Sequence, residues 1–286
     1  MRVPKRSQVI TLAIPASFTI DAPHLREKTS KLGQLARSAA IFRVSQIVLY
    51  DDFIRTAPGE VDFAIKILSY MNTPQYLRKR LYKLSPDLKF VGILPPMRTP
   101  NHPLESQSRL LKPGDFREGV VIETNREFCR VDIGVEKPAQ LRSYLKPNTR
   151  LTVRITTVYP DLEVVTIDNG SIGTYWGFEA RKLGHGLSKE LRKTEYDLTI
   201  ATSRFGSAIN AVSENLRSKW QGATKALLAF GPSSMGLQQI MSREGVDLEK
   251  EFTFVINAVK DQGTDTIRTE EAVTISLSAL ASVVGS

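Results

Sequence analysis

The chain has 286 residues, of which 41% are hydrophobic, and its formal net charge is +9 at pH 7. This length suits one large and one small domain better than a single compact domain. No apolar run approaches the ~18 residues that a membrane helix needs, and the single cysteine, Cys129, excludes an internal disulfide and a thiolate metal cluster. The three histidines are scattered, which argues against a histidine metal site. We therefore expect a cytoplasmic protein with no membrane span and no metal.

The basic excess favours a polyanionic partner, because each phosphate that a protein neutralises releases condensed counterions. An anionic membrane surface would attract the same charge, but neither end of the sequence has the basic amphipathic segment of a membrane anchor. Charge therefore favours a nucleic acid as the partner without identifying which one.

The first third of the chain alternates strand-like and helix-like segments. Buried-strand runs at 9–14 and 47–50 are followed by apolar residues at helical spacing, at 25–39 and 61–72 respectively. Asp21 is the predicted N-cap of the first helix. This order of strand, helix, strand and helix predicts a parallel sheet.

A basic helix is predicted at 74–84, where Thr73 can cap the first turn and three leucines form a narrow apolar stripe. Basic side chains lie mostly off this stripe, with Tyr76 and Tyr82 near them. A charge run of this kind is usually a solvated helix face, but the aromatic neighbours make RNA contact an equal alternative. The predicted RNA-binding residues of this helix are Arg78, Lys79, Arg80 and Lys83.

The pattern changes between 93 and 170. A proline-rich entry leads into short strand-like runs separated by turn signals, at 119–122, 128–133, 151–156 and 164–167. Such spacing predicts a small antiparallel barrel or sandwich. Barrels of the OB type often bind oligonucleotides, although the sequence does not say which side chains share a face. The basic residues that could face RNA are Arg117, Arg130, Lys137, Arg142 and Arg154.

The last third returns to alternation. Strands are predicted at 197–202, 225–230 and 252–257, and a closing helix begins near Thr269, its plausible N-cap. The chain therefore reads as an α/β domain split by an all-β insertion. The predicted divisions are 1–92 and 171–286 for the α/β domain and 93–170 for the inserted barrel.

Glycine-bearing loops follow two of these strands, around Gly231 and around Gly263. Open α/β sheets bind ligands at the carboxyl ends of their strands. Neither loop carries a dinucleotide fingerprint or a P-loop, and ordinary strand-to-helix turns look much the same. By themselves the glycines are weak signals of a ligand.

Several segments, in this order, resemble the archaeal and eukaryotic family of RNA methyltransferases in the SPOUT superfamily. The most specific string is Ile267 to Ala272, within a run that starts at Gln262 and follows Asn257. The resemblance spans nearly the whole chain and includes the segments 9–17, 95–104, 197–200 and 230–232.

The resemblance implies an α/β methyltransferase domain with a deep trefoil knot, interrupted by an OB-like barrel. General rules of topology would reject a knot, since true knots are nearly absent from proteins. The resemblance also implies a homodimer with S-adenosylmethionine sites near the subunit interface. The acceptor would be RNA, with ribosomal RNA and the N3 atom of a uridine favoured.

By the same resemblance, the cofactor pocket is lined by Gly231, Asn257, Ile267 and Thr269. Because adenine is held in a narrow slot by backbone amides and apolar side chains, Ile256 is a suitable further wall. Arg204, in a turn after a strand, could reach the cofactor carboxylate or an RNA phosphate, and a surface arginine is an equal alternative.

A base nitrogen must lose its proton before it accepts a methyl group, which calls for a base or for a cation that favours the anion. Arg268 is the predicted cation, and Glu270 or Glu271 is the predicted proton acceptor. The favoured explanation of both glutamates is nevertheless the negative charge that suits a helix N-terminus.

Two other functions remain open on the sequence alone. A ribosome-assembly factor could keep this fold and bind RNA without turnover, and cofactor binding would distinguish it. A pseudouridine synthase would need a catalytic aspartate, for which Asp51 and Asp52 are available. Both are better explained as the polar end of a strand.

Overall fold

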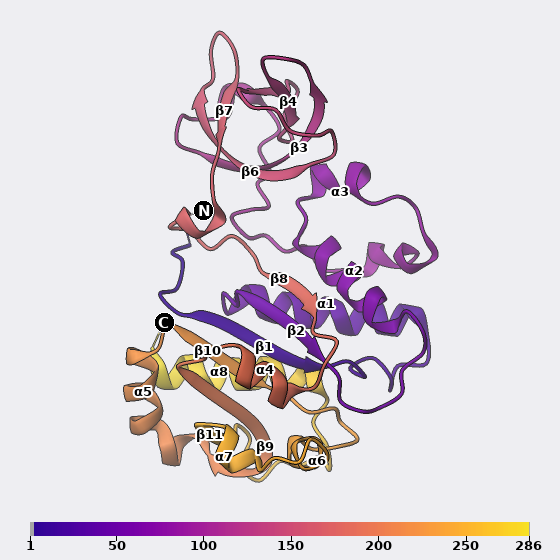
Figure 1. Cartoon of the computed structure of the whole chain (residues 1–286), viewed down its shortest axis with the longest axis vertical. Helices are drawn as coiled ribbons and strands as arrows, with labels where there is room; N and C mark the ends of the chain where they lie inside the picture. Colours follow the sequence, from indigo (N-terminus) through magenta and orange to yellow (C-terminus); the bar gives the residue numbers. More distant parts are fainter. Residues whose placement is uncertain (1–2, 286) are drawn as a thin grey trace. The chain divides into compact units, whose positions relative to one another are not determined.

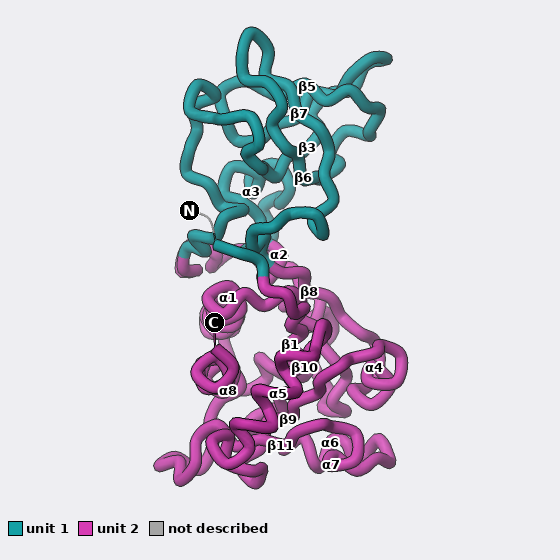
Figure 2. The backbone as a smooth tube through the Cα atoms, turned by 90° about the vertical axis from the view of Figure 1, so that its left-hand side faces the viewer, with its two compact units in different colours: residues 1–5, 70–85, 96–177 teal, residues 6–69, 86–95, 178–286 magenta. Residues whose placement is uncertain are grey.

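The computed structural model describes residues 3–285, which form two compact units (Figure 2). Unit 1 comprises residues 3–5, 70–85 and 96–177, and unit 2 comprises residues 6–69, 86–95 and 178–285. Residues 1, 2 and 286 of the predicted domains 1–92 and 171–286 lie outside the described residues. The predicted boundaries at 93 and 170 stay a prediction.

Unit 2 is built on a parallel sheet that is six-stranded in the described part of the chain, in the order β11-β9-β10-β1-β2-β8 (Figure 1). The inner strands are apolar runs buried on both faces, as parallel strands usually are. The edge strand β8, with sequence EARK, has no such run, which is why no strand was predicted there. The bounds are β1 (Val9–Pro15), β2 (Gln46–Tyr50), β8 (Glu179–Lys182), β9 (Leu198–Ala208), β10 (Lys225–Ala229) and β11 (Phe254–Asn257).

Helices cover both faces of this sheet (Figure 2). One face carries α1 (Leu25–Ile41), α5 (Ser213–Gly222) and α8 (Thr269–Val284), and the other carries α4 (Leu187–Lys193), α6 (Leu237–Arg243) and α7 (Leu248–Glu251). Under the second group, small sheet residues such as Ala13 and Ala229 pack against Ile240, Met241 and Phe252. No helix in the described residues is long and apolar enough to cross a membrane.

Unit 1 contains a closed barrel with the strand order β3-β4-β5-β7-β6. Neighbouring strands are antiparallel except β5 and β7, which are parallel. Alternate side chains fill the interior, among them Val121, Val131, Val153 and the buried Cys129. The sequence did not predict β5, because three residues are too few to show alternation. The bounds are β3 (Phe116–Thr124), β4 (Cys129–Asp132), β5 (Ala139–Leu141), β6 (Arg150–Thr157) and β7 (Glu163–Thr166).

Helix α2 (Glu60–Asn72) begins in unit 2 and ends in unit 1, where α3 (Gln75–Leu81) follows it. Helix α3 packs on the barrel, because the Tyr76 hydroxyl donates to the Glu118 carbonyl at 2.8 Å. The Tyr76 ring covers Gly134, where a Cβ would lie 2.4 Å from it. Helix α3 ends at Leu81, because Tyr82 has an extended backbone, and so it is shorter than the predicted 74–84. Short 3-10 turns occupy Pro86–Leu88, Val91–Ile93, Ser108–Leu110, Asn169–Ser171 and Ile209–Val212.

A polar cluster joins the proline-rich segment to the barrel within unit 1. Asn101, His102 and Glu118 are its buried members, and the exposed Arg150 closes it. The Arg150 Nε donates to the Glu118 carboxylate at 2.7 Å, and Asn101 donates to its other oxygen at 3.1 Å. The His102 Nε2 lies 3.0 Å from the Met71 carbonyl. Burial raises the pKa of Glu118 and lowers the pKa of His102 to about 4. The segment 95–104 therefore has a structural role at the end of α2.

Three predicted helix caps are wrong. The N-cap of α1 is His24 rather than Asp21, whose carboxylate pairs with Lys31. Pro74, not Thr73, is the N-cap of α3. The N-cap of α8 is Arg268 rather than Thr269.

Candidate active site

The candidate site lies where β9, β10 and β11 end. Because these strands are parallel and adjacent, their carboxyl ends lie at one edge of the sheet, where α/β folds bind ligands. Three segments lead from this edge: residues 202–206 within β9, the turn 230–236 after β10, and the loop 258–268 after β11.

The turn after β10 closes on itself at Gly231. A Cβ at this position would lie 2.9 Å from the Met235 carbonyl oxygen and 3.0 Å from the Leu237 nitrogen, so only glycine fits without a backbone shift. The turn is anchored from β2, since the buried Tyr50 hydroxyl donates to the Phe230 carbonyl at 2.8 Å. Backbone atoms thus come close together at this point of the site.

The start of α8 is tied to this turn by a hydrogen bond from the Thr269 hydroxyl to the Gly231 carbonyl, at 3.1 Å. The side chain of Thr269 is therefore used between two loops and not as a helix cap. Of the two predicted apolar walls, Ile256 is 1% exposed and belongs to the sheet core, while Ile267 is half-buried at the end of its loop.

Residues Thr202–Gly206 form a bulge in β9, here called the β9 bulge. Val255 of β11 pairs with Ala201, but the next residue, Ile256, pairs with Ser207. Gly206 permits the excursion, because a Cβ there would lie 2.7 Å from the Val255 carbonyl oxygen. Such a bulge re-aims the side chains that it carries.

Asn257 holds the β9 bulge in place. Its side-chain nitrogen donates to the Arg204 carbonyl at 2.7 Å, and its side-chain oxygen accepts from the Val259 amide at 2.9 Å. Arg204 in turn donates to the Asp265 carbonyl at 2.9 Å. The predicted cofactor residues Arg204 and Asn257 are thus brought together.

Beside these two residues is a pocket of about 270 Å³. Side chains at its rim include amides, carboxylates and one aromatic ring, which is a lining suited to a polar, planar group. The Gln262 amide donates back to the Thr264 and Asp265 carbonyls at 2.8 and 3.1 Å, which orders the loop. The lining residues are Arg204, Phe205, Asn257, Val259, Asp261, Gln262, Thr264 and Asp265.

The predicted catalytic residues lie at the N-cap and in the first turn of α8 and are not among those that line the pocket. Arg268 is exposed, and its backbone amide donates to the Glu271 carboxylate at 2.9 Å, so Glu271 caps the helix. Glu270 is 3% exposed, and a carboxylate oxygen lies 3.3 Å from the Lys31 ammonium.

The predicted RNA-binding residues separate into buried and exposed groups. The prediction is corrected for Arg117, which is 3% exposed and donates to the Glu105 carbonyl at 2.9 Å. Arg78 is also engaged internally, because its guanidinium donates to the Thr73 and Met71 carbonyls and lies over the Tyr70 ring. Both are committed to holding the chain in place. The exposed members are Lys79, Arg80, Lys83 and Arg130. Three further basic residues of the barrel are also exposed: Lys137, Arg142 and Arg154.

Phe205 is the site residue that the sequence analysis missed. It is 85% exposed, although phenylalanine is usually buried, and it lines the pocket from the β9 bulge. The available signal was Gly206, directly after this exposed aromatic residue and close behind the strand predicted at 197–202. Asp52, the candidate for an isomerisation, is fully buried and accepts a hydrogen bond from the Ser17 hydroxyl. Burial raises the pKa of Asp52.

All residues of this site lie within the part of the chain that is similar to known proteins. The sequence matches a family described as "Putative RNA methyltransferase" over residues 9–280. It is 33% identical to a Homo sapiens protein named 28S rRNA (uridine-N(3))-methyltransferase, over 96% of this chain and 78% of the human protein. The Mus musculus protein of that name is 33% identical over 96% of this chain and 76% of its own length. An uncharacterised Haloarcula marismortui protein is 29% identical over 94% of this chain and 98% of its own.

Proposed function

The chain belongs to this family of RNA methyltransferases, and we propose that it methylates N3 of a uridine in ribosomal RNA, with S-adenosylmethionine as donor. The observation that carries the proposal is a family match that includes every residue of the candidate site, from Arg204 to Thr269. The relatives named as uridine-N3 methyltransferases align over the same span of the chain and support this acceptor.

The residues present fit the proposed cofactor. At Gly231 the backbone approaches itself so closely that a Cβ would fill the turn, and backbone groups in such turns can hold adenine. Ile267 is a half-buried apolar neighbour at the end of the adjacent loop. We propose that Gly231, Asn257, Ile267 and Thr269 bind the cofactor, with Ile256 supporting them from the sheet and Arg204 reaching the carboxylate. When bound, the cofactor supplies a methyl group on a sulfonium that is its own leaving group.

The work left to the protein is alignment, exclusion of water and handling of one proton. We propose that Arg268, exposed at the start of α8, stabilises the uridine anion. Lys31 beside Glu270 and the cap made by Glu271 favour structural roles for these glutamates. Proton uptake by Glu270 is the less favoured alternative.

The architecture supports further proposals about the fold. We propose a SPOUT-type domain with a trefoil knot, a homodimer in the cytoplasm, and an OB-type inserted barrel. The strand order of the barrel, with only β5 and β7 parallel, agrees with a five-stranded Greek-key barrel of that type.

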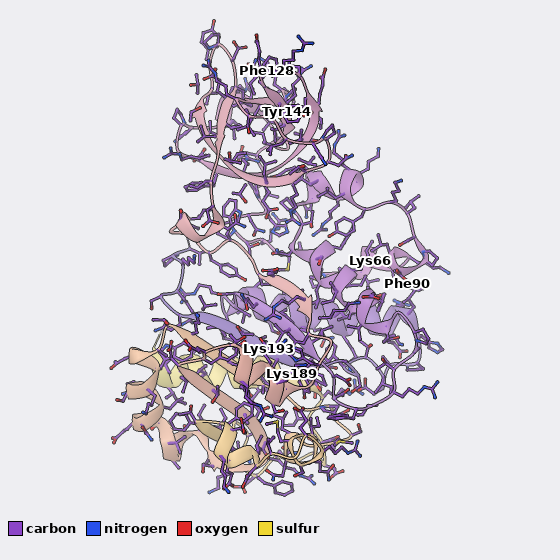
Figure 3. All side chains as sticks on the ribbon, viewed as in Figure 1. Lys66, Phe90, Phe128, Tyr144, Lys189 and Lys193 are labelled. Carbon is purple, nitrogen blue, oxygen red and sulfur yellow. The ribbon has the colours of Figure 1, made fainter. Side chains whose placement is uncertain are left out.

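The barrel offers RNA an exposed end that combines cations with aromatic rings. Arg142 has a side chain that is 86% exposed, and Tyr144 is 78% exposed. Phe128 lies at the same end of the barrel as Tyr144 (Figure 3). Aromatic rings between basic side chains are typical of surfaces that bind single-stranded RNA. We propose that this end, together with Lys79, Arg80, Lys83 and Arg130, contacts the substrate.

Incubation of the full chain with methyl-labelled S-adenosylmethionine and protein-free ribosomal RNA tests the function. We expect label in the RNA, and 3-methyluridine when the RNA is digested to nucleosides and analysed by mass spectrometry. Label in another nucleoside would overturn the proposed acceptor. A folded chain that neither binds S-adenosylhomocysteine nor transfers label would overturn the proposed activity in favour of an assembly factor.

A further inference from the structure

The β9 bulge holds an aromatic ring in solvent at the mouth of the candidate site. Phe205 is 85% exposed, yet its backbone is fixed on both sides. Its amide donates to the Ser203 hydroxyl at 3.2 Å, and the preceding carbonyl accepts from Asn257 at 2.7 Å. The following residue, Gly206, lies directly against β11. The ring therefore stands on an ordered base, and chain flexibility does not account for its exposure.

The surroundings of the ring suit a stacked aromatic ligand. The Arg204 guanidinium carbon lies 4.8 Å from the centre of the Phe205 ring, so this face of the ring already carries a cation. Arginine and aromatic side chains together form the stacking surfaces that hold unpaired bases in RNA-binding proteins.

The lining of the adjoining pocket, which has a volume of about 270 Å³, favours an uncharged planar group over a phosphate. Asp261 and Asp265 at its rim disfavour a phosphate, while Asn257 and Gln262 use their amide nitrogens on carbonyls of the site and so order the pocket. A neutral base is therefore better suited to the pocket than the RNA backbone is.

We propose that Phe205 and the adjoining pocket bind the target base of the RNA, which stacks on the ring after leaving its helix. The proposal rests on the proposed function, because it assigns the methyl acceptor to the pocket between Phe205 and the loop 258–268. The N3 atom of uridine lies on the pairing edge, so an enzyme must unpair the base to reach it. The same loop begins after Asn257 and ends before Thr269, whose hydroxyl donates to the Gly231 carbonyl. The proposed base site therefore adjoins the residues proposed to bind the cofactor.

Binding of fluorescein-labelled decauridylate, followed by fluorescence anisotropy at one fixed salt concentration, tests the proposal. Phe205→Ala is expected to weaken binding roughly tenfold, the loss of one base–aromatic stack, whereas Phe205→Trp keeps it within about threefold. Ile41→Ala is the control, because Ile41 is also an exposed apolar residue, at 56%, and lies far from the site. It is the last residue of α1, which leads to the amino end of β2, and the candidate site lies at the carboxyl ends of the strands. This variant should bind like the unmodified chain.

Photocrosslinking gives a second readout. Decauridylate that carries 4-thiouridine should crosslink to the peptide containing residues 203–206, and Phe205→Ala should abolish that crosslink. The proposal is overturned if Phe205→Ala binds and crosslinks like the unmodified chain. It is also overturned if this substitution turns a dimer into a monomer in sedimentation velocity, because the ring would then be a subunit contact.

The cofactor side is measured separately by titration calorimetry with S-adenosylhomocysteine. Phe205→Ala should bind it with unchanged affinity, and a loss of that affinity with normal RNA binding would overturn the assignment to the base. Failure of the proposed function has a different signature. The unmodified chain would then bind no S-adenosylhomocysteine and transfer no methyl group, whatever the Phe205 variants do with RNA.

Discussion

Thr269 and Arg268 show how neighbouring residues exchange expected roles. The N-cap must have an extended backbone, which Arg268 has, with φ −67° and ψ 151°. Glu271 supplies the side-chain acceptor for that position, so the helix does not need the Thr269 hydroxyl as a cap. That hydroxyl can then reach Gly231 and join two loops of the site.

Thr269→Val tests this bond, because valine keeps the shape and removes the donor. We expect a loss of about 1 kcal/mol in the free energy of unfolding, since the Gly231 carbonyl loses its partner. Affinity for S-adenosylhomocysteine should fall as the turn loosens, whereas Thr269→Ser should retain it. Thermal unfolding and titration calorimetry measure the two effects. Unchanged affinity in Thr269→Val would separate this bond from the cofactor pocket.

The β9 bulge depends on close backbone contact between Gly206 and strand β11. Adding a methyl group there would push against the Val255 carbonyl at 2.7 Å, and backbone cannot move aside as a flexible side chain can. The bulge and the pairing of β9 with β11 are therefore one structural feature, and they position Arg204 and Phe205 together.

Gly206→Ala should destabilise unit 2 by about 1–3 kcal/mol, the usual cost of overpacking. Gly236→Ala is the matched control, because nothing lies within 4 Å of a Cβ at Gly236 and its φ of −69° suits alanine. Urea unfolding measured by circular dichroism compares the two variants. Equal stability of both would contradict the close contact described at the β9 bulge.

The buried His102 in the polar cluster of unit 1 should make the stability of this unit depend on pH. The pKa of His102 is lowered from 6.5 to about 4, so the unfolded chain takes up this proton first as the pH falls. Stability that is present above pH 6.5 is lost between about pH 6.5 and 4, by up to about 3 kcal/mol for this group.

Tryptophan fluorescence can follow unit 1 by itself. Trp176 belongs to unit 1 and Trp220 to unit 2, so a Trp220→Phe background leaves one reporter. The urea midpoint should fall as the pH is lowered from 7 to 4.5, and His102→Asn should reduce that fall. The same pH dependence in both proteins would show that other groups cause it.

For the whole molecule, the charge of +9 predicts RNA binding that weakens as salt increases. If Lys79 and Lys83 each contact a phosphate, replacing both by glutamine should reduce the slope of log K against log salt by about 1.4. Replacing Lys189 and Lys193, exposed on α4 (Figure 3), removes the same charge from the other unit. An equal change in both double variants would mean that the effect is one of net charge alone.

The sequence alone determined the element types and the division into α/β and all-β parts. Apolar runs such as those within 9–14 and 225–230 identify buried strands, because an inner strand of a parallel sheet is covered on both faces. The family and the segments of the site could also be predicted, since the string from Ile267 to Ala272 is local in the chain. Short or polar strands such as β5 and β8 could not, because they owe their structure to their neighbours.

Only the tertiary structure decided which side chains are available. Arg117 and Lys79 look alike in sequence, but one is buried against a carbonyl from a distant segment and the other is exposed. Phe205 reads as part of a turn after the strand predicted at 197–202. In the structure β9 continues to Ala208, and β11 pairs past the bulge that leaves Phe205 exposed. The reason is physical: periodicity records local backbone geometry, whereas exposure and partners depend on contacts between residues far apart in the chain.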